Sequence, residues 1–138
     1  MRVIIGYGNS LRGEDSFGID VIKELKNYNL KDTKLISVFQ LTPELVLEIV
    51  QYSEIIFIDS CYSLTNEYSL ACSIIKQNNA TLSHHISPKI IISFVNNLYN
   101  KYPNYEIYSM LTNSFDNIKD KKNYENSIKE VVSFIVKQ

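Results

Sequence analysis

All four glycines of the 138-residue chain lie within residues 6–18, directly after the apolar run RVIIGY. Glycine permits backbone conformations that other residues resist, and it lets another group approach the main chain closely. An apolar run followed by such a segment predicts a buried strand over residues 2–7 and then a shaped loop. The residues after the loop predict a helix that begins at Asp15 or Ser16. The side chains expected on its buried face are Phe17, Val21, Ile22 and Leu25.

Apolar runs and helix caps predict the remaining elements. Further strands are expected over residues 34–39, 54–59, 68–75 and 106–111. One further helix is expected to begin at Thr42, which precedes Pro43. Another is expected over residues 87–99, where Ser87 precedes Pro88. The last is expected over residues 123–138. The apolar side chains of the last helix are Ile128, Val131, Val132 and Ile135.

Two of these strands indicate how the sheet is arranged. Strand 54–59 is apolar on both faces, which is typical of a central parallel strand. Strand 68–75 follows after too few residues for the crossover that a parallel neighbour needs, so we expect it to be antiparallel and at an edge. The chain therefore predicts an α/β three-layer sandwich, with a twisted five-stranded, mostly parallel sheet, one antiparallel edge strand and helices on both faces. Residues 1–138 are expected to form one domain.

Composition excludes several classes of function. Fourteen basic and fifteen acidic residues give a net charge of -1, which argues against nucleic-acid binding and against a polybasic membrane anchor. The apolar runs are too short to cross a bilayer, and the N-terminus shows no cleavable signal, so a cytoplasmic protein is expected. Cys61 and Cys72 form neither a disulfide framework nor a four-ligand zinc motif, and both are expected to be reduced.

Acidic residues are expected at the carboxyl edge of the sheet, the edge at which its parallel strands end. The first strand leads into a loop that carries Asn9, Glu14 and Asp15, and the third strand ends at Asp59. Ligands of open parallel sheets lie beyond the carboxyl ends of the strands. Because two carboxylates at one edge repel each other, we expect a cation to bind between them and relieve the repulsion. These residues therefore predict a metal site.

The two histidines of the chain, His84 and His85, lie side by side just before the helix predicted at 87–99. Residues 77–83 can extend over about 24 Å, which is long enough for the chain to return from the far end of an edge strand. Either imidazole can therefore reach the carboxyl edge and complete a metal site with the carboxylates.

Other interpretations of the same residues remain open. Asp15 can instead cap the helix that follows, and Glu14 can be solvated near the helix N-terminus. A histidine pair before a helix is more often part of the surface than a ligand pair. The glycine spacing does not match the dinucleotide-binding or P-loop motifs, which argues against nucleotide binding. The sequence also lacks the G-x-S-x-G motif that forms the nucleophile turn of serine hydrolases.

Four segments resemble, in order and spacing, the maturation endopeptidases of nickel-iron hydrogenases. They are GYGNSLRGEDSFGIDV, FQLTPEL, FIDS and SHHISP, and the resemblance runs from Arg2 to about the fifth predicted strand. It implies a twisted five-stranded sheet between helices. It also implies an endopeptidase that removes the C-terminal extension of the hydrogenase large-subunit precursor after nickel insertion, by recognising the bound nickel. That precursor is then the expected partner.

The resemblance assigns roles residue by residue. It implies that Asp15, Asp59 and His84 bind the metal and form the catalytic site, with nickel supplied by the substrate and replaceable by cadmium or zinc. Asn9 matches a turn position where its side chain braces the loop or contacts substrate. Two possible accessory residues depart from the family pattern. Glu14 stands where many relatives have aspartate, and His85 is a second imidazole that competes with His84 for the ligand role.

Two alternative functions follow from the same features. A nickel-dependent chaperone would hold the large subunit through the same ligands without cutting it. The GYGN opening also resembles peptidyl-tRNA hydrolases, although the rest of that pattern is missing and the charge balance does not indicate a basic tRNA channel.

Overall fold

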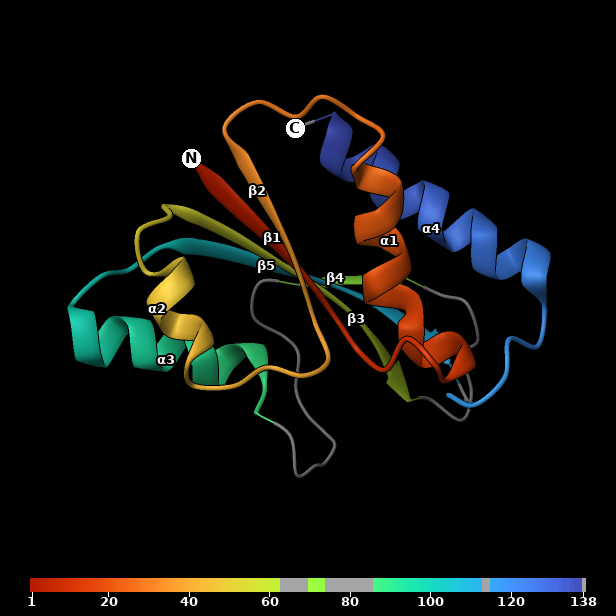
Figure 1. The fold of residues 1–138 in the computed structure, drawn as a ribbon, viewed down its shortest axis with the longest axis horizontal. Coiled ribbons are helices and arrows are strands. Elements are labelled where there is room, and N and C mark those ends of the chain that lie inside the picture. The colour runs from red at the N-terminus through yellow and green to blue at the C-terminus, as the bar shows by residue number, and fades with distance from the viewer. Residues whose placement is uncertain (63–69, 74–85, 113–114, 138) are drawn as a thin grey trace.

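One sheet runs through the middle of the molecule, with strand order β2-β1-β3-β5-β4 (Figure 1). The computed structural model describes residues 1–62, 70–73, 86–112 and 115–137. The strands are β1 Arg2–Tyr7, β2 Thr33–Val38, β3 Glu54–Tyr62, β4 Leu70–Ser73 and β5 Asn104–Thr112. Strands β2, β1, β3 and β5 are parallel neighbours, and the short β4 pairs antiparallel with β5 at the edge of the sheet.

Helices cover both faces of the sheet. They are the 3-10 helix η1 Gly13–Ser16 and the α-helices α1 Phe17–Leu25, α2 Leu45–Ile49, α3 Pro88–Tyr99 and α4 Lys121–Val136. Helices α1 and α4 lie on one face, and α2 and α3 lie on the other (Figure 1). The predicted α/β fold, a parallel sheet flanked by helices on both faces, is confirmed.

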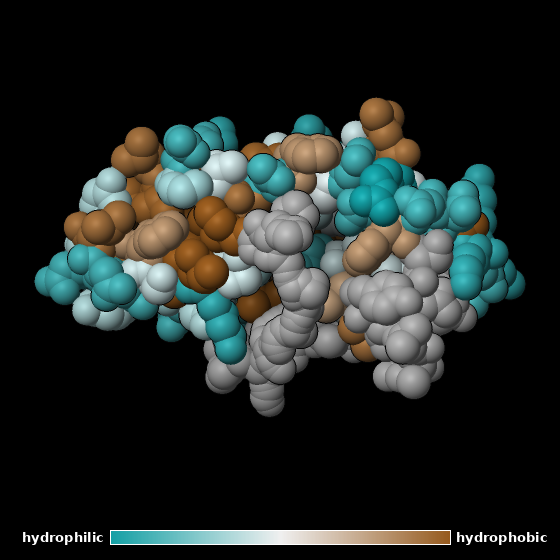
Figure 2. Space-filling model, turned by 90° about the horizontal axis from the view of Figure 1, so that it is seen from below, coloured by the Kyte–Doolittle hydropathy of each residue, from teal (hydrophilic) through white to brown (hydrophobic). Residues whose placement is uncertain are grey.

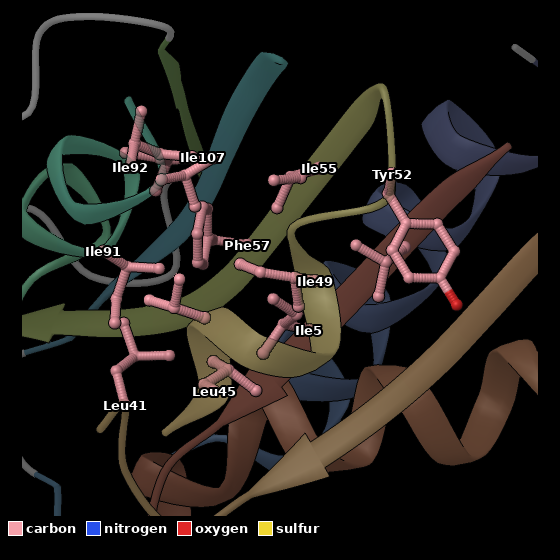
Figure 3. Close-up of a cluster of buried hydrophobic side chains, with 13 residues drawn as sticks. Ile5, Leu41, Leu45, Ile49, Tyr52, Ile55, Phe57, Ile91, Ile92 and Ile107 are labelled. Atoms are coloured by element: carbon pink, nitrogen blue, oxygen red, sulfur yellow. The ribbon is translucent and has the colours of Figure 1, made fainter. Parts of the chain in front are cut away.

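Each face of the sheet carries its own apolar cluster, because successive strand side chains point to opposite faces. On the side of α2 and α3, the strand residues Ile5, Phe57 and Ile107 pack with residues of these helices, such as Ile49 and Ile91 (Figure 3). We call this group the α2–α3 cluster. On the other side, alternate strand residues pack against α1 and α4.

The predicted buried faces are found where the apolar spacing indicated. All four side chains expected on the buried face of α1 are fully buried, and so are Val131 and Ile135 of α4. Residues 55–58 of β3 are buried on both faces, as expected for a central strand. The two clusters thus fix the sheet between its helices, with the ends of β1, β3 and β5 meeting at the carboxyl edge.

The helix starts differ from expectation in two places. The helix expected from Thr42 is preceded by a tighter turn, in which the N–H of Leu45 donates to the carbonyl of Thr42 at 3.0 Å, and regular helix begins only at Leu45. Helix α4 begins earlier than expected because the side chain of Asp120 accepts a hydrogen bond from the N–H of Asn123 at 3.2 Å. Helix α3 begins as predicted, with Ser87 as its cap. Within the described ranges, no helix is long and apolar enough to span a membrane.

Candidate functional site at the carboxyl edge

The loop after β1 is organised around Asn9. The side-chain Oδ1 of Asn9 accepts a hydrogen bond from the N–H of Leu11 at 2.9 Å, and its carbonyl accepts one from the N–H of Arg12 at 3.0 Å. The N–H of Asn9 donates to Oδ2 of Asp15 at 3.2 Å. Asn9 therefore braces the loop, and its backbone helps to orient the Asp15 carboxylate.

Gly8 allows the backbone of Asp15 to lie against the end of β1. Gly8 has φ +147°, and a Cβ atom at this position would lie 2.0 Å from the carbonyl oxygen of Asp15. The alternative that Asp15 caps the following helix is wrong, because the capping position of α1 is Ser16, and no side chain caps it. The Asp15 carboxylate is therefore held by the loop rather than by α1.

Glu14 points into the protein. Its side chain is only 1% exposed, Oε1 accepts a hydrogen bond from the hydroxyl of Thr112, and Oε2 accepts one from the N–H of Lys119 at 3.0 Å. The alternative that Glu14 is solvated is therefore wrong. Its carboxylate joins the glycine loop to the end of β5 and to the segment that leads into α4. A buried carboxylate with these partners has a structural role.

Asp59 lies in β3 between two hydroxyl groups. The Tyr7 hydroxyl donates to Oδ2 of Asp59, and the Ser109 hydroxyl donates to Oδ1 at 2.5 Å. The prediction that the third strand ends at Asp59 is wrong, because β3 continues to Tyr62 alongside β5. This pairing sets Asp59 directly opposite Ser109.

The surroundings of Asp59 favour its protonated form. The pKa of Asp59 is raised to about 6: burial is the largest cause and the negative charge of Asp15 adds to it, whereas the hydrogen bonds from Ser109 and Tyr7 act in the opposite direction. Burial and the charge of Asp59 also raise the pKa of the Tyr7 hydroxyl well above its usual value, which keeps it a neutral donor. Because the charge of Asp15 acts on Asp59, the two carboxylates lie close enough to interact, as predicted for this edge.

The predicted histidines, His84 and His85, lie outside the described residues. The nearest described residue after them is Ile86, which packs against the α2–α3 cluster. Tyr7, whose hydroxyl reaches Asp59, packs against the same cluster. Among the described residues, no group of three or more His, Cys, Asp or Glu side chains is arranged to hold a metal ion.

Sequence reasoning missed the two hydroxyl partners of Asp59. Ser109 is a polar residue within the apolar strand pattern EIYSML, and a polar residue on a buried strand face is a signal that could have identified it. Tyr7 follows four buried residues, Val3 to Gly6, and gave no comparable signal. Tyr124 was also missed; its hydroxyl donates to Oδ2 of Asp20 at 2.6 Å and joins α4 to the start of α1.

Three solved structures share this fold over nearly the whole chain. The nickel-iron hydrogenase maturation protease HycI from Thermococcus kodakarensis has a TM-score of 0.78 and 17% identity, with 99% of this chain and 90% of that chain covered. The hydrogenase maturating endopeptidase HybD from E. coli has a TM-score of 0.75 and 15% identity, covering 99% and 92%. A hydrogenase 2 maturation peptidase from a Thaumarchaeota archaeon has a TM-score of 0.69 and 18% identity, covering 99% and 96%.

These likenesses show that the chain has the fold of the hydrogenase maturation proteases, as the resemblance of its motifs implied. Comparisons with protein-family models and with curated proteins find no match.

Proposed function

We propose that this protein is an endopeptidase that removes the C-terminal extension of a nickel-iron hydrogenase large-subunit precursor after nickel insertion, and that it recognises the bound nickel. The fold shared with the HycI and HybD proteases supports the reaction class. The observation that carries the proposal is the approach of Asp15 and Asp59, which come from the glycine loop and from β3. Two such carboxylates favour a cation between them.

In this proposal, nickel belongs to the substrate. Asp15 and Asp59 bind it at coordination positions that the precursor leaves open, with the imidazole of His84 as the third ligand from this chain. Ile86, two residues after His84, packs against the same cluster as Tyr7, which supports an approach of this part of the chain to Asp59. His85 is the alternative ligand.

The two carboxylates anchor the precursor and orient the peptide bond to be cut. Nickel supplies Lewis-acid polarisation of the scissile carbonyl, and water or a carboxylate takes the proton of the attacking water. A cation between Asp15 and Asp59 would also remove the like-charge repulsion that contributes to the raised pKa of Asp59. The carboxylate pair is therefore better suited to a site that holds a cation than to a site without one.

An exposed hydrophobic surface lies toward the end of the sheet at which β3 and β5 begin, and it suits a protein partner. Hydrophobic side chains gather over the half of the molecule formed by α2 and α3 (left in Figure 2). Leu47 of α2 is 67% exposed and Leu98 of α3 is 70% exposed. These helices cover the face of the sheet on which the Asp59 side chain lies. Exposed apolar patches of this kind commonly mark protein interaction sites.

The test is incubation of nickel-loaded and nickel-free precursor with the protein, followed by mass spectrometry. We expect the loss of a C-terminal fragment from the nickel-loaded precursor only. Asp15→Asn should lower the rate by more than about 100-fold, because a ligand should matter more than its hydrogen-bond partners, whose loss usually costs 10–100-fold. His84→Ala should have a similar effect and His85→Ala a milder one, and the opposite ranking would exchange their roles.

Asp32→Asn is the matched control, because it removes one exposed carboxylate directly before β2, at the opposite edge of the sheet, and asparagine tolerates the positive φ of this position as well as aspartate does. It should cleave like the wild type. Unchanged precursor mass with retained nickel-dependent binding would favour a chaperone instead, and activity on peptidyl-tRNA would favour the other hydrolase. Full processing by Asp15→Asn would remove Asp15 from the site.

A further inference from the structure

Tyr7, Asp59 and Ser109 form a row across the three central strands at the carboxyl edge. Strand β3 lies between β1 and β5, and its register pairs Ile58 with Gly6 and Asp59 with Ser109. Tyr7 follows Gly6, so it stands beside Asp59 on the other side. Tyr7 packs against the α2–α3 cluster, as does Ile107, which shares a sheet face with Ser109. The three side chains therefore lie on the face covered by α2 and α3.

Both oxygen atoms of the Asp59 carboxylate accept a hydrogen bond in this row. The Tyr7 hydroxyl donates to Oδ2, and the Ser109 hydroxyl donates to Oδ1 at 2.5 Å. Two donors from opposite neighbouring strands hold the carboxylate between them, which opposes rotation of the side chain about both its Cα–Cβ bond and its Cβ–Cγ bond. An ionised carboxylate has about four lone-pair sites, so each oxygen keeps one that can bind a cation.

The two donors are themselves held in place. Ser109 is 2% exposed and lies within paired backbone of β5, next to β3 and β4. The ring of Tyr7 packs against the α2–α3 cluster, and Tyr7 is paired with Val38 in the neighbouring strand β2. Because sheet and core fix both hydroxyls, the orientation of the carboxylate follows from the sheet and not from the loops around it.

We propose that Tyr7 and Ser109 are positioning residues, which hold the Asp59 carboxylate in one orientation so that its remaining lone pairs meet the nickel of the precursor. The inference rests on the proposed function for the identity of the cation. Partners of a metal-binding carboxylate typically affect metal affinity or activity by 10–100-fold. Tyr7→Phe and Ser109→Ala remove one donor each while leaving the strand and most of the packing in place.

The first test measures the side-chain rotamer of Asp59 by NMR, from the three-bond couplings between its carboxyl carbon and its backbone nitrogen and carbonyl carbon. We expect a single rotamer in the wild type and averaged couplings in the Tyr7→Phe, Ser109→Ala double variant. Tyr105→Phe and Ser127→Ala are the matched controls, because they remove a tyrosine and a buried serine hydroxyl elsewhere in the fold, and they should leave the couplings unchanged. A single rotamer in the double variant would overturn the inference.

The second test compares binding and cleavage of nickel-loaded and nickel-free precursor. Each single variant should lower kcat/KM on nickel-loaded precursor by about 10–100-fold. It should also reduce the preference for nickel-loaded over nickel-free precursor, whereas a purely structural defect would weaken the binding of both forms alike. Averaged couplings with wild-type cleavage would overturn the positioning role. If the wild type neither cleaves nor prefers nickel-loaded precursor, the proposed function is wrong, and the couplings alone decide whether the carboxylate is held.

Discussion

Asp59→Asn is expected to abolish cleavage of nickel-loaded precursor while making the protein more stable at neutral pH. Cleavage should fall by more than about 100-fold, because the substitution removes an anionic ligand and not merely its partner. Stability should rise because burial and the charge of Asp15 raise the pKa of Asp59 to about 6, so the ionised form is disfavoured in the folded state. The neutral amide has the same shape, and its oxygen can still accept the Ser109 hydrogen bond.

The sign of the pH dependence follows from the direction of this pKa shift. The pKa of an aspartate in an unfolded chain is about 3.9. Between that pH and about 6, the folded protein binds more protons at Asp59 than the unfolded chain does. The free energy of unfolding of the wild type should therefore fall as the pH rises through this window. A shift of about two units corresponds to a cost of at most about 3 kcal/mol above the window.

Urea unfolding at pH 4 and pH 7, with a chelator present, measures this effect. We expect Asp59→Asn to gain roughly 1–3 kcal/mol over the wild type at pH 7 and much less at pH 4. Asp120→Asn, which changes an exposed carboxylate, should track the wild type at both pH values. An equal change at both pH values would mean that the charge of Asp59 is not the cause.

Gly18→Ala is expected to produce the largest loss of stability. A Cβ atom at Gly18 would lie 2.3 Å from the carbonyl oxygen of Ile58 and 2.8 Å from the nitrogen of Tyr7, which belong to the central strands β3 and β1. Neither strand can move away without breaking its ladder, so α1 would have to shift. We expect the free energy of unfolding to fall by roughly 4 kcal/mol or more, a cost reserved for a few severe mechanisms.

The sign of this effect is diagnostic, because glycine to alanine within a helix ordinarily stabilises a protein. Urea unfolding measures it, with Lys23→Ala as the control at an exposed position of the same helix. That control should stay within about 0.5 kcal/mol of the wild type. A Gly18→Ala protein as stable as the wild type would show that α1 does not approach the strands so closely.

Much of the fold could be predicted because apolar spacing is a local property. The burial of Val21 and Leu25 and the position of β1 follow from residues close together in the sequence. A shaped loop after β1 is a local explanation for the clustering of glycines, but the main cause is a tertiary contact. A Cβ atom at Gly6 would lie 2.1 Å from the carbonyl oxygen of Gly18, so these two glycines let α1 approach the sheet.

The candidate site was predictable only in part. The rule that parallel strands end at one edge brought Asp15 and Asp59 together correctly. It could not separate the adjacent acids Glu14 and Asp15, because the 3-10 turn over residues 13–16 decides which one points inward. It also could not identify Ser109 as the partner of Asp59, because the register of β5 against β3 depends on contacts between distant segments.

A crystal of the protein soaked with cadmium, as a substitute for nickel, tests the central claim most directly. We expect one cadmium ion bound by carboxylate oxygens of both Asp15 and Asp59, with an imidazole nitrogen of His84 as a further ligand. Cadmium bound only elsewhere, or His84 on the opposite flank of the sheet from the two carboxylates, would contradict the account.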